Sequence, residues 1–194
     1  MATYQPQGIE FAETAPLQFE GVGVIDGTPA EVWAVLCDHE SWPQWMPSMK
    51  SCRATSTPAT GVGSTRIVDL DGGASFSEEF IAWDEPEVWA FTGLSGPPVF
   101  ERLVERVTLK QLGPRLTEVT YRMAIGPRRG CGPLVKLARG KVEKSLRIGL
   151  RNLNHVVAAN RPPESDVPDD AQGDLAVEHD HDHDHDHDHD HDHG

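Results

Sequence analysis

The sequence predicts an α+β fold in which a seven-stranded curved antiparallel sheet wraps around a long C-terminal helix, with two short helices after the first strand. Three observations predict it: a strand-to-helix opening, six strand-like runs at hairpin spacing, and one long amphipathic helix. A sheet that curls around a helix leaves an apolar space between them. Spaces of this kind commonly hold small molecules.

The opening elements are a strand from Leu17 to Ile25 and a helix that begins after Thr28. Thr28-Pro29-Ala30-Glu31 combines three helix-start signals, because Thr28 can cap, proline fits the first turn, and Glu31 can accept a bond from the amide of the cap residue. This helix is expected to end near Asp38. A second, short helical piece is expected over residues 41–45.

Six strand-like runs follow between Met49 and Ile125, separated by turn clusters rich in Gly, Pro and Asp. An antiparallel meander explains this spacing. In the last run one face is expected to point inward, and it carries Thr117, Val119, Tyr121, Met123 and Ile125. The run from Phe100 to Gln111 carries charge on both faces, so its inward face stays open.

The longest helix is expected from Pro133 to about Ala159. Apolar residues recur in it at three- and four-residue spacing, which predicts one stripe facing the sheet. The stripe consists of Leu134, Ala138, Val142, Leu146, Leu150, Leu153 and Val157. Most of the lysines and arginines of this segment lie off the stripe.

Charge divides the chain into three blocks. The 194 residues carry a net charge of −14, and residues 164–194 alone hold 13 acidic residues and no basic one. Residues 1–125 hold 17 acidic and 8 basic residues, whereas residues 126–161 hold 1 and 9. The basic block is a solvated face, a face screened by the acidic tail, or a contact for an anionic membrane surface or an acidic partner.

Several classes are disfavoured. The chain has no apolar run of the roughly 20 residues that a transmembrane helix needs, and no secretory signal is visible at its N-terminal end. Cys37, Cys52 and Cys131 lack metal-ligand spacing, which favours reduced thiols and a cytoplasmic protein. Nucleic acid is disfavoured because the basic block adjoins a larger acidic one. We therefore expect an N-terminal extension over residues 1–16, one domain over residues 17–160, and a disordered acidic tail over residues 161–194.

The segment from Val24 to Asp38, with Pro29-Ala30-Glu31-Val32-Trp33 at its centre, and the following Trp42-Pro43-Gln44-Trp45 resemble the START-like (SRPBCC) superfamily with the helix-grip fold. Gly61-Val62-Gly63-Ser64 and Ala82-Trp83-Asp84-Glu85-Pro86 are also similar to family features. The nearest branch is that of polyketide cyclases, dehydrases and lipid-transport proteins. The resemblance implies a hydrophobic ligand cavity between the sheet and the last helix, but it carries no catalytic residue over.

Large aromatic and flexible apolar side chains are the candidate cavity lining. The expected ligand-binding residues are Trp45, Met46, Trp83, Trp89, Phe91, Tyr121 and Met123. Tyr121 and Glu79 are the candidate catalytic residues, since a carboxyl group in an apolar cavity could act as an acid or base. Glu78 is the alternative if the other face of its strand points inward. His39 and His155 are expected to be exposed.

The tail contains seven His-Asp pairs followed by His193, which places eight histidines at alternate positions. Such imidazoles can bind Zn²⁺, Ni²⁺, Co²⁺ or Cu²⁺. The candidate metal ligands are His179, His181, His183, His185, His187, His189, His191 and His193. A solubilising tail and an engineered purification sequence are the alternatives.

Three functions follow. The first is binding or transport of a hydrophobic or aromatic small molecule, with no required cofactor. The second is a cyclase, aromatase or dehydratase that uses Tyr121 and Glu79, and the third is metal binding or buffering by the tail. The expected partner is a hydrophobic small-molecule ligand, with no nucleic acid and no transmembrane segment. The oligomeric state stays open.

Overall fold

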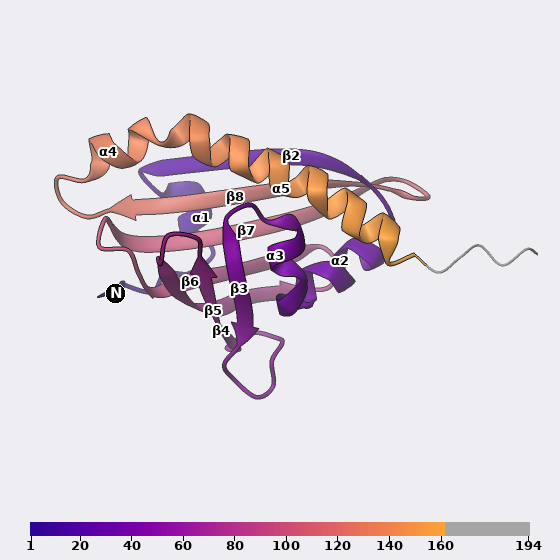
Figure 1. Ribbon diagram of the computed structural model, residues 1–194, viewed down its shortest axis with the longest axis horizontal. Helices are drawn as coiled ribbons and strands as arrows, with labels where there is room; N and C mark the ends of the chain where they lie inside the picture. Colours follow the sequence, from indigo (N-terminus) through magenta and orange to yellow (C-terminus); the bar gives the residue numbers. More distant parts are fainter. Residues whose placement is uncertain (162–194) are drawn as a thin grey trace, which may run out of the picture. The chain divides into compact units, whose positions relative to one another are not determined.

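A curled antiparallel sheet and one long helix form the framework of the protein. The computed structural model describes residues 1–161, and the seven main strands follow the order β2-β8-β7-β6-β5-β4-β3 (Figure 1). These strands are β2 (Leu17–Asp26), β3 (Met49–Ala54), β4 (Thr65–Leu70), β5 (Ser75–Asp84), β6 (Val88–Gly96), β7 (Phe100–Gly113) and β8 (Leu116–Pro127). The predicted seven-stranded helix-grip architecture is confirmed.

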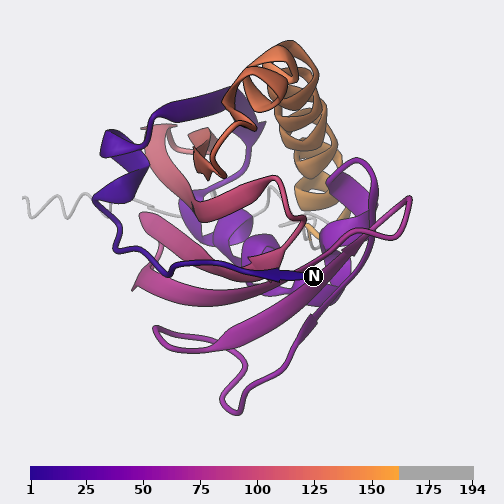
Figure 2. The same cartoon turned by 90° about the vertical axis from the view of Figure 1, so that its left-hand side faces the viewer.

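The long helix α5 (Arg139–Ala159) lies across the open side of the curved sheet, as the end-on view in Figure 2 shows. It approaches the edge strand β2 very closely. A Cβ atom added at Gly21 would come within 2.7 Å of Leu146 Cβ, and one at Gly23 within 2.9 Å of Leu150 Cβ. Glycine at both positions therefore allows the helix to pack directly on the strand backbone.

The first helix begins as its sequence predicts. In α2 (Pro29–Cys37) the Thr28 hydroxyl accepts a bond from the Glu31 amide at 3.3 Å, and the Glu31 carboxylate accepts one from the Thr28 amide at 2.7 Å. This reciprocal pair is a capping box. A 3₁₀ turn (His39–Ser41) and the short helix α3 (Trp42–Trp45) follow and bring two tryptophans into the core.

The predicted last helix is broken, which corrects part of the expected apolar stripe. The segment forms α4 (Gly132–Leu137) and α5, with Ala138 between them at a ψ of −7°. Val135 is buried in a cluster with Tyr4, Phe19 and others, whereas Leu134 and Ala138 are exposed. Packing of Val135 against the sheet fixes the orientation of α4 and turns Leu134 outward.

The first 16 residues pack against the sheet. β1 (Ala2–Thr3) pairs with the end of β6, and α1 (Phe11–Thr14) lies on the outer face of β7 and β8. Phe11, Ala12 and Ala15 form a buried cluster there with Val104 and Ala124. This cover explains why Val104 is buried on the outer face of β7.

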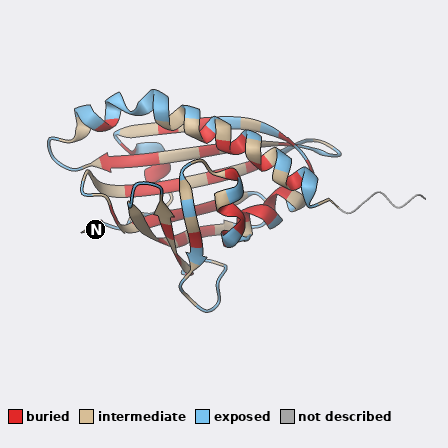
Figure 3. Ribbon diagram, viewed as in Figure 1, coloured by how far each residue is buried: buried red, intermediate tan, exposed pale blue. Residues whose placement is uncertain are grey.

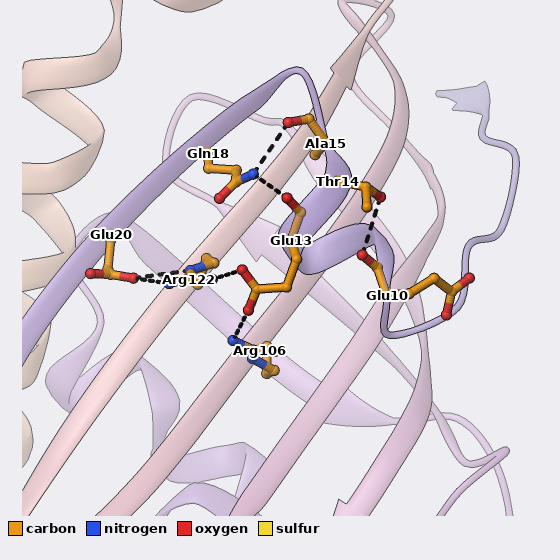
Figure 4. A network of polar contacts seen from close by, with 8 residues as sticks. All are labelled: Glu10, Glu13, Thr14, Ala15, Gln18, Glu20, Arg106 and Arg122. Carbon is orange, nitrogen blue, oxygen red and sulfur yellow. Dashed lines mark hydrogen bonds and ion pairs between the residues drawn. The ribbon is translucent and has the colours of Figure 1, made fainter.

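Ion pairs fasten α1 to the two strands beneath it. Glu13 contacts Arg106 at 2.6 Å and also Arg122, which in turn holds Glu20 of β2 at 2.7 Å (Figure 4). The network therefore links α1, β2, β7 and β8 through exposed and half-buried side chains.

The expectation that His39 is exposed is wrong. Its ring is buried and stacks on Phe80 with 5.5 Å between ring centroids, and its Nε2 lies 3.2 Å from the Ala59 carbonyl oxygen. The 3₁₀ turn directs this side chain toward the sheet, and helical spacing did not indicate this. His155 is exposed as expected. None of the helices in residues 1–161 is long and apolar enough to cross a membrane.

Candidate functional site

A buried ion pair lies on the inner face of the sheet. Arg66 of β4 and Glu78 of β5 are register partners, and Arg66 Nε donates to Glu78 Oε2 at 2.7 Å. Only 1% of the Arg66 side chain and 5% of the Glu78 side chain are exposed. Because the interior solvates charge poorly, the Glu78 carboxyl group depends on Arg66 for its ionised form, and the Arg66 charge depends on Glu78 for its neutralisation.

Aromatic rings surround the guanidinium group of Arg66. Its Cζ atom lies 4.2 Å from the ring centroid of Trp42, 4.4 Å from that of Phe91 and 4.8 Å from that of Trp89. Such distances are within the range of cation–π attraction. The cation is therefore fixed at the centre of the aromatic core.

A second buried polar pair joins the neighbouring strands β7 and β8. The Tyr121 hydroxyl donates a hydrogen bond to Glu105 Oε2, and both residues are buried. Burial, together with the nearby Glu78 charge, raises the pKa of Glu105 to about 8. Burial likewise raises the pKa of Tyr121 well above its usual range. Both groups therefore hold their protons at neutral pH.

The charges of this buried cluster balance. Burial raises the pKa of Glu78 and the Arg66 guanidinium opposes that rise. Although burial alone disfavours the charged form of Arg66, the Glu78 charge raises its pKa above the ordinary value. We assign the charge of Glu78 to its pairing with Arg66, since a guanidinium stays protonated in proteins. Glu105 is then the protonated carboxyl group, and the net charge is zero.

Three buried donors in this region have no acceptor among residues 1–161. They are Arg66 Nη1 and the indole nitrogens of Trp45 and Trp89. In contrast, Trp42 Nε1 donates to the Leu36 carbonyl oxygen at 3.0 Å. Buried donors normally have partners, and each one left without costs about 1–3 kcal/mol. A group that accepts hydrogen bonds would satisfy them.

The predicted lining residues gather largely in one place. Trp45, Trp89, Phe91 and Tyr121 belong to the main core cluster, and Met46 and Trp83 pack against it. Met123 packs instead in the adjacent cluster around Tyr4 and Phe19. The role of these residues in ligand binding stays a prediction.

Of the two neighbouring glutamates on β5, the structure places Glu78 in the buried cluster and leaves Glu79 half-buried on the other face of the strand. Sequence reasoning left this choice open. It missed Arg66 and Glu105 as members of the cluster. Arg66 shares the strand face of the buried Val68, and Glu105 shares that of Leu103 and Val107. This alternation was the available signal.

The candidate metal ligands His179 to His193 lie outside the described residues. Within residues 1–161 no group of three or more His, Cys, Asp or Glu side chains is arranged to hold a metal ion. Cys37, Cys52 and Cys131 are free, and burial raises the pKa of Cys52 to about 11. A thiol with this pKa is a poor nucleophile at neutral pH.

The sequence pattern of the polyketide cyclase / dehydrase and lipid transport family matches residues 16–158. The chain belongs to this family. Proteins described as uncharacterized from Mycobacterium tuberculosis and Mycobacterium bovis are each 32% identical to it over 158 residues, which cover 78% of the chain and 91% of each relative. Family membership agrees with the helix-grip fold and with the START-like resemblance of the opening motif.

Solved structures show the same fold at low sequence identity. A START superfamily protein from Mycobacterium smegmatis superposes with a TM-score of 0.61 at 18% identity, covering 73% of this chain and 97% of that one. An aromatase/cyclase from Streptomyces sp. R1128 gives 0.61 at 15% identity, covering 73% and 93%. A major latex-like protein from Panax ginseng gives 0.57 at 20% identity, covering 75% and 98%. These likenesses establish the fold alone.

Proposed function

We propose that this protein binds a hydrophobic or aromatic small molecule that carries an acceptor oxygen, in the region between the sheet and α5. The observation that carries the proposal is the set of three donors that have no partner within residues 1–161, which are Arg66 Nη1, Trp45 Nε1 and Trp89 Nε1 of the aromatic core. A carbonyl, carboxylate or phenolic oxygen would accept from these donors. The apolar part of the ligand would contact the surrounding rings.

The electrostatics favour a single oxygen-bearing head group. Arg66 supplies the one buried positive charge of the cluster. Glu78 accepts a hydrogen bond only from the Nε atom of Arg66. In a medium of low dielectric constant, a hydrogen bond from a charged donor is stronger than one in water. The ligand's oxygen would therefore lie on the free edge of the guanidinium group.

Access to this region involves α3. The four-residue helix carries Trp45 and is attached to α5 by a bond from Asn152 Nδ2 to the Trp45 carbonyl oxygen at 3.2 Å. Met46 follows directly and packs beside Gly149 of α5. A short helix with so few backbone bonds opens more easily than the sheet. We infer that α3 moves when the ligand enters.

The first experiment is native mass spectrometry of gently purified protein, with and without chelator, which reports a co-purified ligand, a metal and the stoichiometry together. Titration with naphthoic acid and with naphthalene, followed by tryptophan fluorescence, then separates head-group recognition from apolar binding. We expect naphthoic acid to bind more tightly. Equal affinity for the two probes, or no binding of either, would overturn the proposal.

The variant for this titration is Arg66→Met/Glu78→Gln, which removes the donor and keeps the interior neutral. It is expected to weaken naphthoic acid binding about tenfold or more, the value of a charged hydrogen bond, and to leave naphthalene unchanged. Arg115→Met/Glu31→Gln is the matched control, since it removes an ion pair of 3.0 Å on the surface.

A second candidate function is a cyclase, aromatase or dehydratase reaction on a polyketide-like substrate. Its supporting observation is the protonated Glu105 beside Tyr121, an acid of pKa about 8 in an apolar region. A group with this pKa can donate and accept protons near neutral pH. Loss of water from a poly-β-keto thioester, followed by mass spectrometry in the unmodified protein and in Tyr121→Phe and Glu105→Gln, tests it. An unchanged substrate in the unmodified protein would exclude this candidate.

A further inference from the structure

The α4 helix and the first turns of α5 form a surface that is both apolar and basic, which we call the α4 surface. Two leucines project from it: Leu134 is 61% exposed and Leu137 is 84% exposed. Figure 3 shows α4 and the adjoining part of α5 mostly in the colour of exposed residues. Exposed leucines three residues apart lie on one side of a helix, so they form a single apolar site.

Exposed cations recur along α5. Lys141, Lys144, Arg147 and Arg151 follow one another at spacings of three and four residues, and all four are exposed. Arg128 and Arg129, in the turn before α4, and Lys136 of α4 are exposed as well. Residues that recur at this spacing share one helix face. The four cations therefore share one face of α5, and α4 with its two exposed leucines directly precedes that helix.

Negative charge is nearly absent from the α4 surface. Glu143 is the one acidic residue between residues 126 and 161, and Arg139 holds it in an ion pair of 2.9 Å. The remaining cations of α4 and α5 that are named above have no ion-pair partner within residues 1–161. Within residues 1–161, no carboxylate therefore neutralises these charges.

We propose that the α4 surface binds anionic phospholipid bilayers peripherally, with Leu134 and Leu137 in the headgroup region and the lysines and arginines of α5 on the lipid phosphates. Amphipathic helices with leucines beside lysine and arginine bind membrane interfaces through both effects. No helix within residues 1–161 can cross a bilayer, so the contact is at the surface.

Two other occupants fit the α4 surface less well. A second copy would bring two strongly basic faces together. Positive charges on the two faces would then repel each other across the interface. A nucleic acid would use the cations but would leave the two leucines in water, with no apolar contact. A bilayer of anionic lipid satisfies both the leucines and the cations.

The test is co-sedimentation of the full chain with vesicles of phosphatidylcholine alone and of phosphatidylcholine with phosphatidylglycerol. We expect binding to the anionic vesicles that weakens as salt is added, since screening shortens the range of the attraction. Leu134→Ser/Leu137→Ser is expected to weaken it about tenfold. Lys141→Gln/Lys144→Gln is expected to do the same or more, since each cation near an anionic surface contributes about fivefold.

Matched controls separate the α4 surface from the whole molecule. Val62→Ser alters an apolar residue that is 68% exposed in a loop outside α4. Lys50→Gln/Lys110→Gln removes two exposed lysines elsewhere, so it changes the net charge by the same amount as the α5 variant. Both controls should bind anionic vesicles like the unmodified protein, and all variants should keep the same unfolding temperature.

Three results would overturn the proposal. The first is no binding of the full chain to anionic vesicles at low salt. The second is equal loss in the control variants, which would assign the effect to net charge. The third is a dimer in sedimentation velocity that Leu134→Ser/Leu137→Ser dissociates while vesicle binding is unchanged, which would make the leucines a protein interface. Because none of these variants touches the Arg66 region, naphthoic acid binding is measured alongside and should not change.

Discussion

The Tyr121 hydroxyl donates its hydrogen bond to a carboxyl group, that of Glu105, whose pKa burial raises to about 8. The two residues come from neighbouring strands, and both are buried. At neutral pH both side chains of the pair are uncharged, and the proton of Glu105 can be removed by a modest rise of pH. The protonation state of Glu105 can therefore be measured through the pH dependence of stability.

Glu105→Gln should change how stability depends on pH. The folded state binds the Glu105 proton more tightly than the unfolded chain, whose ordinary glutamate pKa is 4.5. Stability from this group is therefore fully present below that value and declines as pH rises toward about 8, by up to roughly 1.4 kcal/mol per pH unit. Urea unfolding across this range should show a shallower decline in Glu105→Gln. Parallel curves would contradict the assigned protonation state.

Breaking the Arg66–Glu78 pair on one side should cost more than removing it on both. Arg66→Met leaves a buried carboxylate without its cation, for which about 3–5 kcal/mol of destabilisation is expected. Arg66→Met/Glu78→Gln should recover much of this loss, because no buried charge remains. Urea unfolding of the unmodified protein, both single variants and the double variant measures the coupling. Additive effects would show that the two side chains do not depend on each other.

Asn152→Ala should loosen α3. It removes the 3.2 Å bond to the Trp45 carbonyl oxygen, at an expected cost of about 1 kcal/mol. Amide exchange at Met46, whose N–H bonds to the Trp42 carbonyl oxygen, should accelerate. Asn154→Ala is the control on the same helix, since Asn154 accepts from the Asp26 amide instead. If both variants accelerate exchange at Met46 equally, the bond from Asn152 does not hold α3.

Gly21→Ala should push α5 away from β2. The new methyl group would lie 2.7 Å from Leu146 Cβ, and overpacking of this kind costs about 1–3 kcal/mol. Gly140→Ala, in α5 with nothing within 4 Å, should stabilise the protein by up to about 1 kcal/mol through helix propensity. Thermal unfolding of the two variants should therefore shift in opposite directions. A neutral Gly21→Ala would mean that the helix moves freely over the strand.

The eight tail histidines predict binding of Ni²⁺ or Zn²⁺ by the full chain. A chain ended at Ser165 should lose it, since no metal-holding cluster lies within residues 1–161. Calorimetric titration of both chains at neutral pH measures the difference. Equal metal binding by the shortened chain would place the ligands elsewhere.

Local patterns predicted much of this fold because they report local physics. The capping box at Thr28, the six strands and the inward face that carries Tyr121 follow from hydrogen bonding and period-two alternation within short segments. The errors arise where distant segments decide. Leu134 belongs to the apolar stripe by spacing, but the packing of Val135 against Tyr4 and Phe19 turns it outward.

The candidate site likewise combines features that local sequence predicts with features that depend on distant segments. Aromatic residues such as Trp89 and Phe91 were predicted by type, whereas the burial of Glu105 was hidden because its strand carries charge on both faces and α1 buries Val104 on the opposite face. Arg66 is buried only because Glu78 and three rings converge on it from other elements. No single segment contains that information.

The place of residues 2–5 in the sheet changes where the folding unit begins. The Tyr4 amide donates to the Leu94 carbonyl oxygen of β6, and the Gln5 amide donates to the Glu101 carbonyl oxygen of β7. This segment therefore joins β6 and β7 at a point where the two strands no longer pair with each other. The family match begins at residue 16 and omits it. A chain started there would leave backbone donors and acceptors of β6 and β7 open, as an edge on which another strand can assemble.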